Sequence, residues 1–362
     1  MSEYPGQAPA VAEHWTEGSL LPSPLLSCHD LEKRYGRGAQ AVQAVAGVSL
    51  GVMEGETLGL VGESGCGKST LARTLLRLES PTAGTIRFAG DDLTGLKGRR
   101  LRTARRDFQI ILQDPYTSLN PRMTVSQTVL EPLIVHGIGD RAGRRAQVAE
   151  LLERVGLNPA FGKRFPHELS GGQRQRVGIA RALALKPRFI VCDEAVSALD
   201  VSIQAQVLNL LADLRDSMGL TYLFVSHNLG VVRHIADRVA VMYLGKIVEV
   251  ARSEEFFEAP RHPYSQLLLS AVLEPDPDIE PPESEFGGEA PSPSSPPSGC
   301  RFRTRCPFAR DLCAAEEPEL RSIGGSRAVA CHFWDEIAAG RAEPTGRRIV
   351  DGPQRENGVD RG

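Results

Sequence analysis

Residues 57–70 read "TLGLVGESGCGKST". The first five residues are mostly apolar and predict a buried strand, whereas "STLARTLLRLE" (69–79) has helical periodicity. Between them, residues 62–70 fit the pattern G-x-x-x-x-G-K-[ST], whose small residues let backbone N–H groups turn toward a phosphate. The plainer interpretation is an ordinary glycine-rich turn between a strand and a helix. The strand and helix on either side favour a phosphate loop.

Further strands and helices alternate along the rest of the chain. The short apolar runs are 48–52, 108–113, 188–194, 221–227 and 238–245, and the other helical stretches are 146–156 and 204–219. This alternation indicates an α/β layered domain with a largely parallel sheet.

Composition argues against three classes of protein: nucleic-acid binders, membrane-spanning proteins and secreted proteins. The 362 residues carry 42 Lys+Arg against 45 Asp+Glu, a formal net charge of −3, so they lack the basic field of nucleic-acid binders. No run of 18 apolar residues occurs, and the N-terminus lacks the features of a secretory signal. We therefore expect a chain that neither spans a membrane nor is secreted, in a reducing compartment.

Composition also divides the chain. We predict a flexible N-terminal segment (1–24), a main α/β domain (25–255) with a helical subdomain at about 114–175, a C-terminal helical extension (256–273), a Pro-rich linker (274–299), a cysteine-rich metal or cluster module (300–334) and a flexible tail (335–362).

A second motif, "RFIVCDE" (188–194), ends in two carboxylates. Asp193, at the end of the predicted strand, is suited to hold Mg²⁺, as is Ser69 of the loop. Glu194 is the candidate base for an attacking water. Two acids after a strand are common elsewhere, so this motif gains weight only beside the others.

A third motif, "LSGGQRQRVGIARALAL" (169–185), predicts a helix capped by Ser170, with two glycines that leave its N-terminus open to a phosphate. The plainer interpretation is a well-capped amphipathic helix. A second phosphate-binding element is redundant if one chain encloses one nucleotide. It has a use if each chain completes the site of another.

With "SALD" (197–200) and "SH" (226–227), these motifs, in this order and spacing, resemble the ATP-binding cassette (ABC) ATPases. The resemblance spans about residues 25–255 and implies an ABC-type P-loop nucleotide-binding domain with a mixed sheet core. It also implies a head-to-tail dimer around two ATP molecules with Mg²⁺. The implied phosphate loop consists of Gly62, Glu63, Ser64, Gly65, Cys66, Gly67, Lys68, Ser69 and Thr70.

The resemblance assigns roles to further residues. It implies that Tyr35 stacks on adenine, that Gln113 senses Mg²⁺ and the membrane partner, and that His227 contacts the γ-phosphate. Glu194 would polarise water and Asp200 would bridge the dimer. The residues implied to reach the ATP of the opposite subunit are Ser170, Gly171, Gly172 and Gln173.

Plainer readings stay open for three of these residues. Tyr35 is otherwise a surface aromatic, Gln113 a polar residue at a strand end, and His227 a satisfied histidine. The chain also departs from the family pattern at two positions. Ala195 stands where Pro is usual, which leaves the orientation of Glu194 open, and Asn228 stands where Asp is usual.

The stretches "QDPYTSLNPRMTV" (113–125) and "RHPYSQLLLSAV" (261–272), with the cysteine-bearing tail, resemble the F-type ATPase subunit of oligopeptide and dipeptide permeases. This implies a peripheral protein at the cytoplasmic face of the membrane, two transmembrane permease subunits, and a sister ATPase or second copy of this chain. An external binding protein would deliver the peptide. A nickel importer, a cassette ATPase acting on DNA and a metal- or redox-sensing regulator stay open as alternatives.

The tail holds Cys300, Cys306, Cys313 and Cys331. Structural zinc sites more often use cysteine pairs two to four residues apart, so the wider spacing here favours an iron–sulfur cluster over zinc. The resemblance implies a [4Fe–4S] cluster. Zinc and unligated thiols stay open. Cys28, Cys66 and Cys192 are expected to be small buried residues.

Overall fold

The computed structural model describes residues 23–38, 41–114, 118–271 and 291–344. Its main sheet has eight strands in the order β11–β12–β10–β9–β3–β8–β7–β6. Their bounds are β3 (Thr57–Val61), β6 (Phe108–Ile111), β7 (Phe189–Asp193), β8 (Thr221–Ser226), β9 (Arg238–Tyr243), β10 (Lys246–Arg252), β11 (Arg321–Gly324) and β12 (Arg327–Val329). The five strands from β9 to β6 are parallel, and β10, β12 and β11 continue the sheet antiparallel.

The parallel strands are apolar because both faces of the sheet are covered. In β7, Ile190 and Cys192 join the core on one face, and Phe189 and Val191 join the core on the other. Every residue of β3, β7, β8 and β9 is buried. The α/β fold predicted from the sequence is confirmed, with a sheet that is mixed and mostly parallel.

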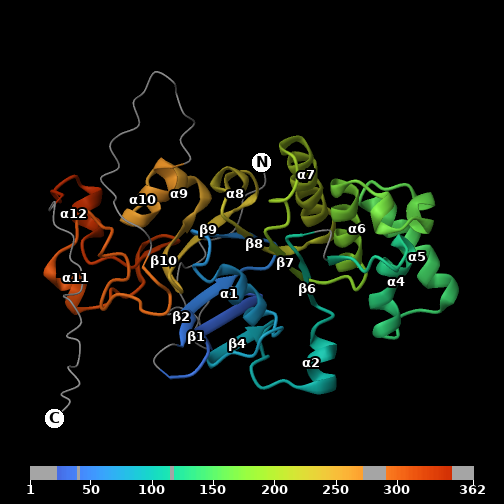
Figure 1. Cartoon of the computed structure of the whole chain (residues 1–362), viewed down its shortest axis with the longest axis horizontal. Helices are drawn as coiled ribbons and strands as arrows, with labels where there is room; N and C mark the ends of the chain where they lie inside the picture. Colours follow the sequence, from blue (N-terminus) through green and yellow to red (C-terminus); the bar gives the residue numbers. More distant parts are fainter. Residues whose placement is uncertain (1–22, 39–40, 115–117, 272–290, 345–362) are drawn as a thin grey trace, which may run out of the picture.

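A smaller antiparallel sheet covers one face. Its order is β2–β1–β4–β5, with β1 (Leu26–Tyr35), β2 (Val42–Val52), β4 (Ala83–Phe88) and β5 (Asp91–Asp92). Its apolar residues share a core with α1 (Lys68–Leu75) and the main sheet. In Figure 1 this sheet lies below the main sheet, and α7, α8 and α9 lie above it.

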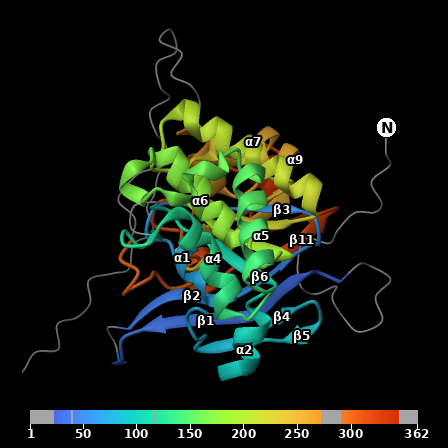
Figure 2. The ribbon, with the colours of Figure 1, turned by 90° about the vertical axis from the view of Figure 1, so that its right-hand side faces the viewer.

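Helices gather on the opposite face and beyond β6. Those near the sheet are α7 (Val201–Met218), α8 (Leu229–Ile235), α9 (Ser253–Glu258) and α10 (Pro263–Ser270). Those beyond it, on the right in Figure 1 and facing the viewer in Figure 2, are α4 (Val125–Val135), α5 (Arg141–Arg154), η3 (Pro159–Lys163), η4 (Pro166–Glu168) and α6 (Gly171–Leu183). Short helices α2 (Gly98–Ala104), α11 (Asp311–Ala315) and α12 (Trp334–Ala338) complete the set. Within the described ranges, no helix combines the length and apolarity needed to cross a membrane.

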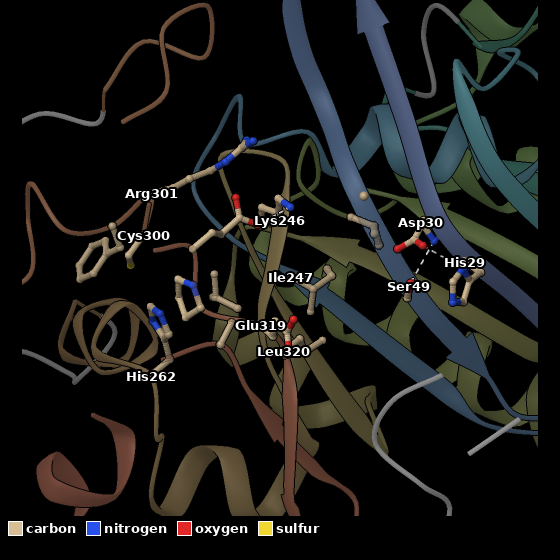
Figure 3. Close-up of a pocket in the computed structure, with 17 residues that line it drawn as sticks. His29, Asp30, Ser49, Lys246, Ile247, His262, Cys300, Arg301, Glu319 and Leu320 are labelled. Atoms are coloured by element: carbon tan, nitrogen blue, oxygen red, sulfur yellow. Dashed lines mark hydrogen bonds and ion pairs between the residues drawn. The ribbon is translucent and has the colours of Figure 1, made fainter. Parts of the chain in front are cut away.

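The cysteine-bearing segment is built into the main sheet. Glu249 and Val250 of β10 pair with Val329 and Ala328 of β12. An ion pair of 2.5 Å between Lys246 Nζ and Glu317 Oε1 adds a polar contact. Between this segment and the small sheet lies a cavity of about 330 Å³, with Cys300 and Arg301 on one side and His29 and Asp30 on the other (Figure 3). Residues 291–344 therefore extend the main domain.

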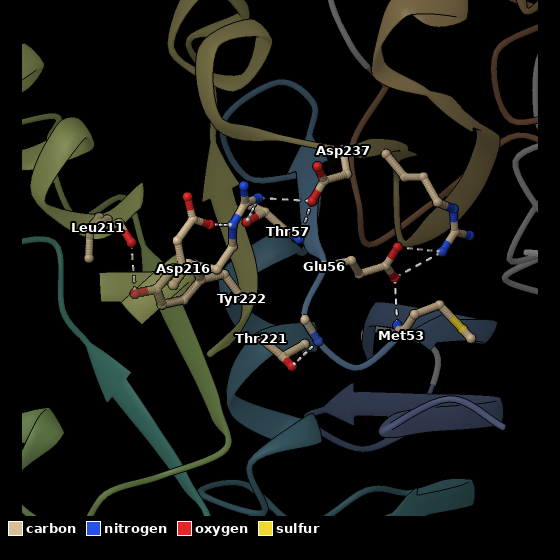
Figure 4. A network of polar contacts seen from close by, with 11 residues as sticks. Met53, Glu56, Thr57, Leu211, Asp216, Thr221, Tyr222 and Asp237 are labelled. Carbon is tan, nitrogen blue, oxygen red and sulfur yellow. Dashed lines mark hydrogen bonds and ion pairs between the residues drawn. The ribbon is translucent and has the colours of Figure 1, made fainter. Parts of the chain in front are cut away.

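A polar network secures the start of β3 (Figure 4). Arg238 NH1 donates to Glu56 Oε1 at 3.0 Å, and both side chains are nearly buried. Asp237 Oδ2 accepts from the Thr57 amide at 2.7 Å and from Arg215 at 3.0 Å. These contacts fix the strand that leads directly into the phosphate loop.

Candidate nucleotide-binding site

The loop of residues 62–67 connects β3 to α1 and depends on glycine at two close approaches. Gly62 has φ +152° and Gly67 has φ +107°. A Cβ atom at Gly62 would lie 2.2 Å from the Met242 carbonyl oxygen, and one at Gly67 would lie 2.1 Å from that of Ala44. Only glycine fits at either position. The loop is thereby pressed against β9 and β2, and α1 begins directly behind it.

Lys68 is buried at the start of α1, with an exposed fraction of 4%. Its Nζ donates to the carbonyl oxygens of Gly62 at 2.8 Å and Glu63 at 2.9 Å. These neutral partners hold the ammonium group inside the loop without cancelling its charge. The loop therefore presents a cation and the N-terminus of a helix, a combination suited to phosphate.

Ser69 and Asp193 meet although 124 residues separate them in sequence. Ser69 Oγ donates to Asp193 Oδ1 at 2.8 Å, and Arg73 NH2 lies 3.8 Å from Asp193 Oδ2. Burial raises the pKa of the Asp193 carboxyl, while the Ser69 bond and Arg73 oppose that rise. A hydroxyl and a carboxylate are oxygen donors of the kind that Mg²⁺ takes.

The three predicted catalytic residues, Glu194, Gln113 and His227, are in contact, and Glu194 lies between the other two. Its Oε2 accepts from Gln113 Nε2 at 2.7 Å, and its Oε1 lies 3.2 Å from His227 Nδ1. The backbone has φ +51°, outside the ordinary range, and its N–H donates to the Val225 carbonyl at 3.0 Å. The carboxylate therefore points to the end of the sheet where Gln113 and His227 converge.

The two departures from the family pattern have visible structural roles. Ala195 is buried at 1% exposure, and the Ser197 N–H donates to the Glu194 carbonyl at 3.1 Å. This turn and the bond to Val225 constrain Glu194 without a proline. Asn228 caps α8, since its side chain accepts from the Val231 N–H at 3.3 Å.

Tyr35 ends β1 with 40% of its surface exposed, and its hydroxyl donates to Glu79. Lys33 Nζ lies 5.0 Å from the centre of the ring. The ring is therefore partly exposed to solvent, with a cation over its face.

The segment of residues 170–173 lies apart from the phosphate loop. Ser170 and Gln173 form a reciprocal capping box at the start of α6, beside an open cavity of about 380 Å³ that also includes Gly172 and Arg176. In the described part of the chain, no hydrogen bond or ion pair joins residues 170–173 or Asp200 to residues 62–70. A single chain therefore brings together the first and second motifs and leaves the third facing outward.

The phosphate loop, the acidic strand end and the outward-facing glycine helix start define an ATPase of the ATP-binding cassette class. Residues 45–197 match the family model described as ABC transporter, and residues 248–313 match the model described as oligopeptide/dipeptide transporter, C-terminal region. The chain belongs to the ATP-binding subunits of oligopeptide and dipeptide ABC transporters, in which ATP hydrolysis is coupled to transport.

Individual proteins support this assignment. The chain is 51% identical over 315 residues to the putative oligopeptide transport ATP-binding protein YkfD of Bacillus subtilis, covering 86% of this chain and 96% of that protein. It is 52% identical over 303 residues to the oligopeptide transport ATP-binding protein AppF of the same organism, covering 83% and 92%. The dimeric structure of the ATP-binding cassette MJ0796 bound to ADP and Pi superposes with a TM-score of 0.57 at 31% identity, over 63% of this chain and 98% of that one.

The four tail cysteines lie around one small cavity. They are Cys300, Cys306, Cys313 and Cys331, and they line it with His262, Phe302 and His332. Across the described ranges, no three His, Cys, Asp or Glu side chains are close enough to hold a single metal ion. The remaining cysteines, Cys28, Cys66 and Cys192, are free and buried, as predicted.

Sequence reasoning missed two residues that contact the phosphate loop. Tyr264 Oη accepts from the Glu63 N–H at 2.8 Å, and the Arg305 guanidinium forms an ion pair with the Glu63 carboxylate. They come from α10 and from the cysteine-bearing segment, far along the chain. No local pattern marks either residue, because each acts only through a contact made by folding.

Proposed function

We propose that this chain hydrolyses ATP to drive import of oligopeptides or dipeptides, with Glu194 as the general base. The observation that carries the proposal is the Glu194 carboxylate held between Gln113 and His227, beside the Ser69–Asp193 pair. Bound MgATP supplies the phosphoryl group to be transferred, with Ser69, Asp193 and Gln113 as the residues that would hold its Mg²⁺.

Each residue of the site has a separate role in ATP binding or hydrolysis. Lys68 supplies positive charge for the phosphates, since its present carbonyl partners leave that charge uncompensated. Glu194 accepts a proton from the attacking water, and Gln113 and His227 orient its carboxylate. Tyr35 offers its ring to the adenine base. Positioning and charge account for most of the catalysis in phosphoryl transfer.

The outward-facing residues Ser170–Gln173 and Asp200 act on a neighbouring ATPase, which is a sister subunit or a second copy of this chain. Two transmembrane permease subunits, fed by an extracytoplasmic binding protein, complete the assembly at the cytoplasmic face of the membrane. The relatives named for peptide transport favour peptides over nickel as cargo.

Purification of the tagged chain from detergent-solubilised membranes tests the proposal. Two integral membrane subunits should accompany the chain, and ATP hydrolysis by the complex should rise when peptide-loaded binding protein is added. If the nickel-loaded binding protein stimulates ATP hydrolysis instead, the cargo is nickel and not a peptide. Recovery of nucleic acid without a membrane partner contradicts the proposal.

For the cysteines, we propose a [4Fe–4S] cluster. Burial raises the pKa of Cys300 to about 11 and that of Cys331 to about 12, so these thiols would have to release protons on ligating a cluster. Four thiols that line one cavity supply the number of ligands that a [4Fe–4S] cluster takes. Anaerobic purification should yield brown protein with about four iron atoms per chain, lost in Cys306→Ser. Colourless protein with one zinc per chain contradicts the proposal.

A further inference from the structure

We propose that Arg305 is a positioning residue for the nucleotide site and holds the phosphate loop through Glu63. Arg305 NH1 donates to Glu63 Oε2 at 2.9 Å, and NH2 donates to Oε1 at 3.0 Å. Two parallel bonds between a guanidinium and a carboxylate fix direction as well as distance. The inference rests on the proposed function, because it takes residues 62–70 as the ATP phosphate site.

The surroundings hold the guanidinium in one place. Arg305 is 11% exposed, and its central carbon lies 5.9 Å from the Tyr243 ring centre and 5.8 Å from that of Phe302. The Glu63 side chain is 33% exposed, so solvent screens this bidentate pair mainly from the carboxylate side and less than it screens an ordinary surface ion pair. The Arg305–Glu63 pair therefore differs from fully exposed ion pairs, which contribute little to stability.

Glu63 is fixed at three points. Its side chain is held by Arg305, its N–H by Tyr264 Oη at 2.8 Å, and its carbonyl by Lys68 Nζ at 2.9 Å. Tyr264 is fully buried and packs on Tyr243, with ring centres 4.5 Å apart. The C-terminal part of the chain thus sets the position of the loop's second residue, and that residue in turn holds the phosphate-binding lysine.

Arg305 is itself held in a tight turn of the cysteine-bearing segment. Its N–H and that of Cys306 both donate to the Phe302 carbonyl, at 2.9 and 3.1 Å. The Cys300 N–H donates to the Cys313 carbonyl at 2.7 Å, which ties the start of this turn to α11. The cysteine-bearing segment therefore reaches the phosphate loop directly through Arg305, beside an indirect route in which its Phe302 packs on Tyr264.

Removing the Arg305 contact leaves Glu63 held only by the backbone contacts to Tyr264 and Lys68, and binding of ATP must then restore the order that its side chain has lost. The effect should fall on affinity more than on turnover, because Glu194, Gln113 and His227 keep their own contacts. We expect Arg305→Gln to weaken equilibrium binding of MgATP by about 5- to 10-fold and to raise KM in parallel. Turnover at saturating ATP should change less than about twofold.

A double-mutant cycle gives the decisive measurement. Arg305→Gln, Glu63→Gln and the double variant should show the same loss of affinity, because each removes the same pair. Arg310→Gln is the matched control, since it breaks the 2.7 Å ion pair with Glu336 in the same segment, away from the loop. The control should bind MgATP like the parent.

Hydrogen exchange at the amides of residues 62–68 supplies a readout independent of activity and should be faster in Arg305→Gln. If Arg305→Gln fails to fold, Glu63→Gln decides, because it leaves the cysteine-bearing segment intact. Affinities within twofold of the parent for both single variants overturn the proposal. A parent that does not bind MgATP overturns the proposed function instead.

Discussion

His227 Nδ1 lies 3.2 Å from Glu194 Oε1, and this contact links the ends of two neighbouring parallel strands. Replacing Glu194 with Gln removes the proton acceptor but keeps the shape of the side chain. We expect ATP hydrolysis to slow by about 10²- to 10⁴-fold, with MgATP still bound. Phosphate release at saturating ATP measures the effect. The control is Glu254→Gln, at an exposed position of α9, and parental turnover in Glu194→Gln would assign the base elsewhere.

Two loop glycines should respond differently to alanine. Gly65 and Gly67 both have positive φ, but only at Gly67 would the new methyl group collide with backbone, 2.1 Å from the Ala44 carbonyl oxygen. Gly65→Ala should cost about 1 to 2 kcal/mol of unfolding free energy from backbone strain alone. Gly67→Ala should cost more than about 3 kcal/mol. Urea denaturation compares the two variants, and equal losses would contradict the close approach.

Two ion pairs of the main domain differ in burial. Glu56 and Arg238 are 11% and 7% exposed, whereas Glu54 and Arg188 are 62% and 46% exposed. Glu56→Gln leaves a buried guanidinium without its counter-charge and should cost about 3 kcal/mol of unfolding free energy. Glu54→Gln should cost less than about 1 kcal/mol. Thermal or urea unfolding tests the contrast, which similar losses would refute.

His262 should make the free energy of unfolding fall as the pH is lowered. Burial lowers its pKa to about 3, while an unfolded histidine titrates near 6.5. Between these values the unfolded chain binds more protons, so stability falls as the pH falls, by about 2 kcal/mol at pH 5.

The matched test is His262→Asn, whose side-chain oxygen can replace Nδ1 as acceptor for the Tyr264 N–H. The variant should lose this share of the pH dependence between pH 6.5 and 5 while keeping the cap of α10. Urea titrations at several pH values measure the slope. An unchanged slope in the variant would show that His262 does not titrate in this range.

The sequence predicts well those parts of the structure that are formed by residues close together along the chain. β3, the phosphate loop and α1 are contiguous, and each carries its own pattern of apolar residues or glycines. The pairing of Ser69 with Asp193 also follows from the motifs, because each sits beside the carboxyl end of a strand in the same sheet. Such ends meet wherever the strands are parallel.

Long-range contacts escape prediction. β12 has three residues, too few for a periodic pattern, so its pairing with β10 has no sequence signal. Glu63 and Arg305 are 242 residues apart, and although Glu63 lies in the predicted phosphate loop, Arg305 looks like an ordinary surface charge in sequence. His262 likewise becomes buried only when α10 packs against the cysteine-bearing segment, where its ring lies beside Phe302.

The pairing of β10 with β12 has a consequence for synthesis. A ribosome releases β10 about 75 residues before β12, which at 5 to 20 residues per second is a delay of about 4 to 15 seconds. During that interval the outer edge of β10 has hydrogen-bonding groups without a strand partner, the kind of edge on which nascent chains aggregate. A chain that stops short of residue 327 would keep that edge permanently, so premature termination should yield insoluble protein rather than a working cassette without its tail.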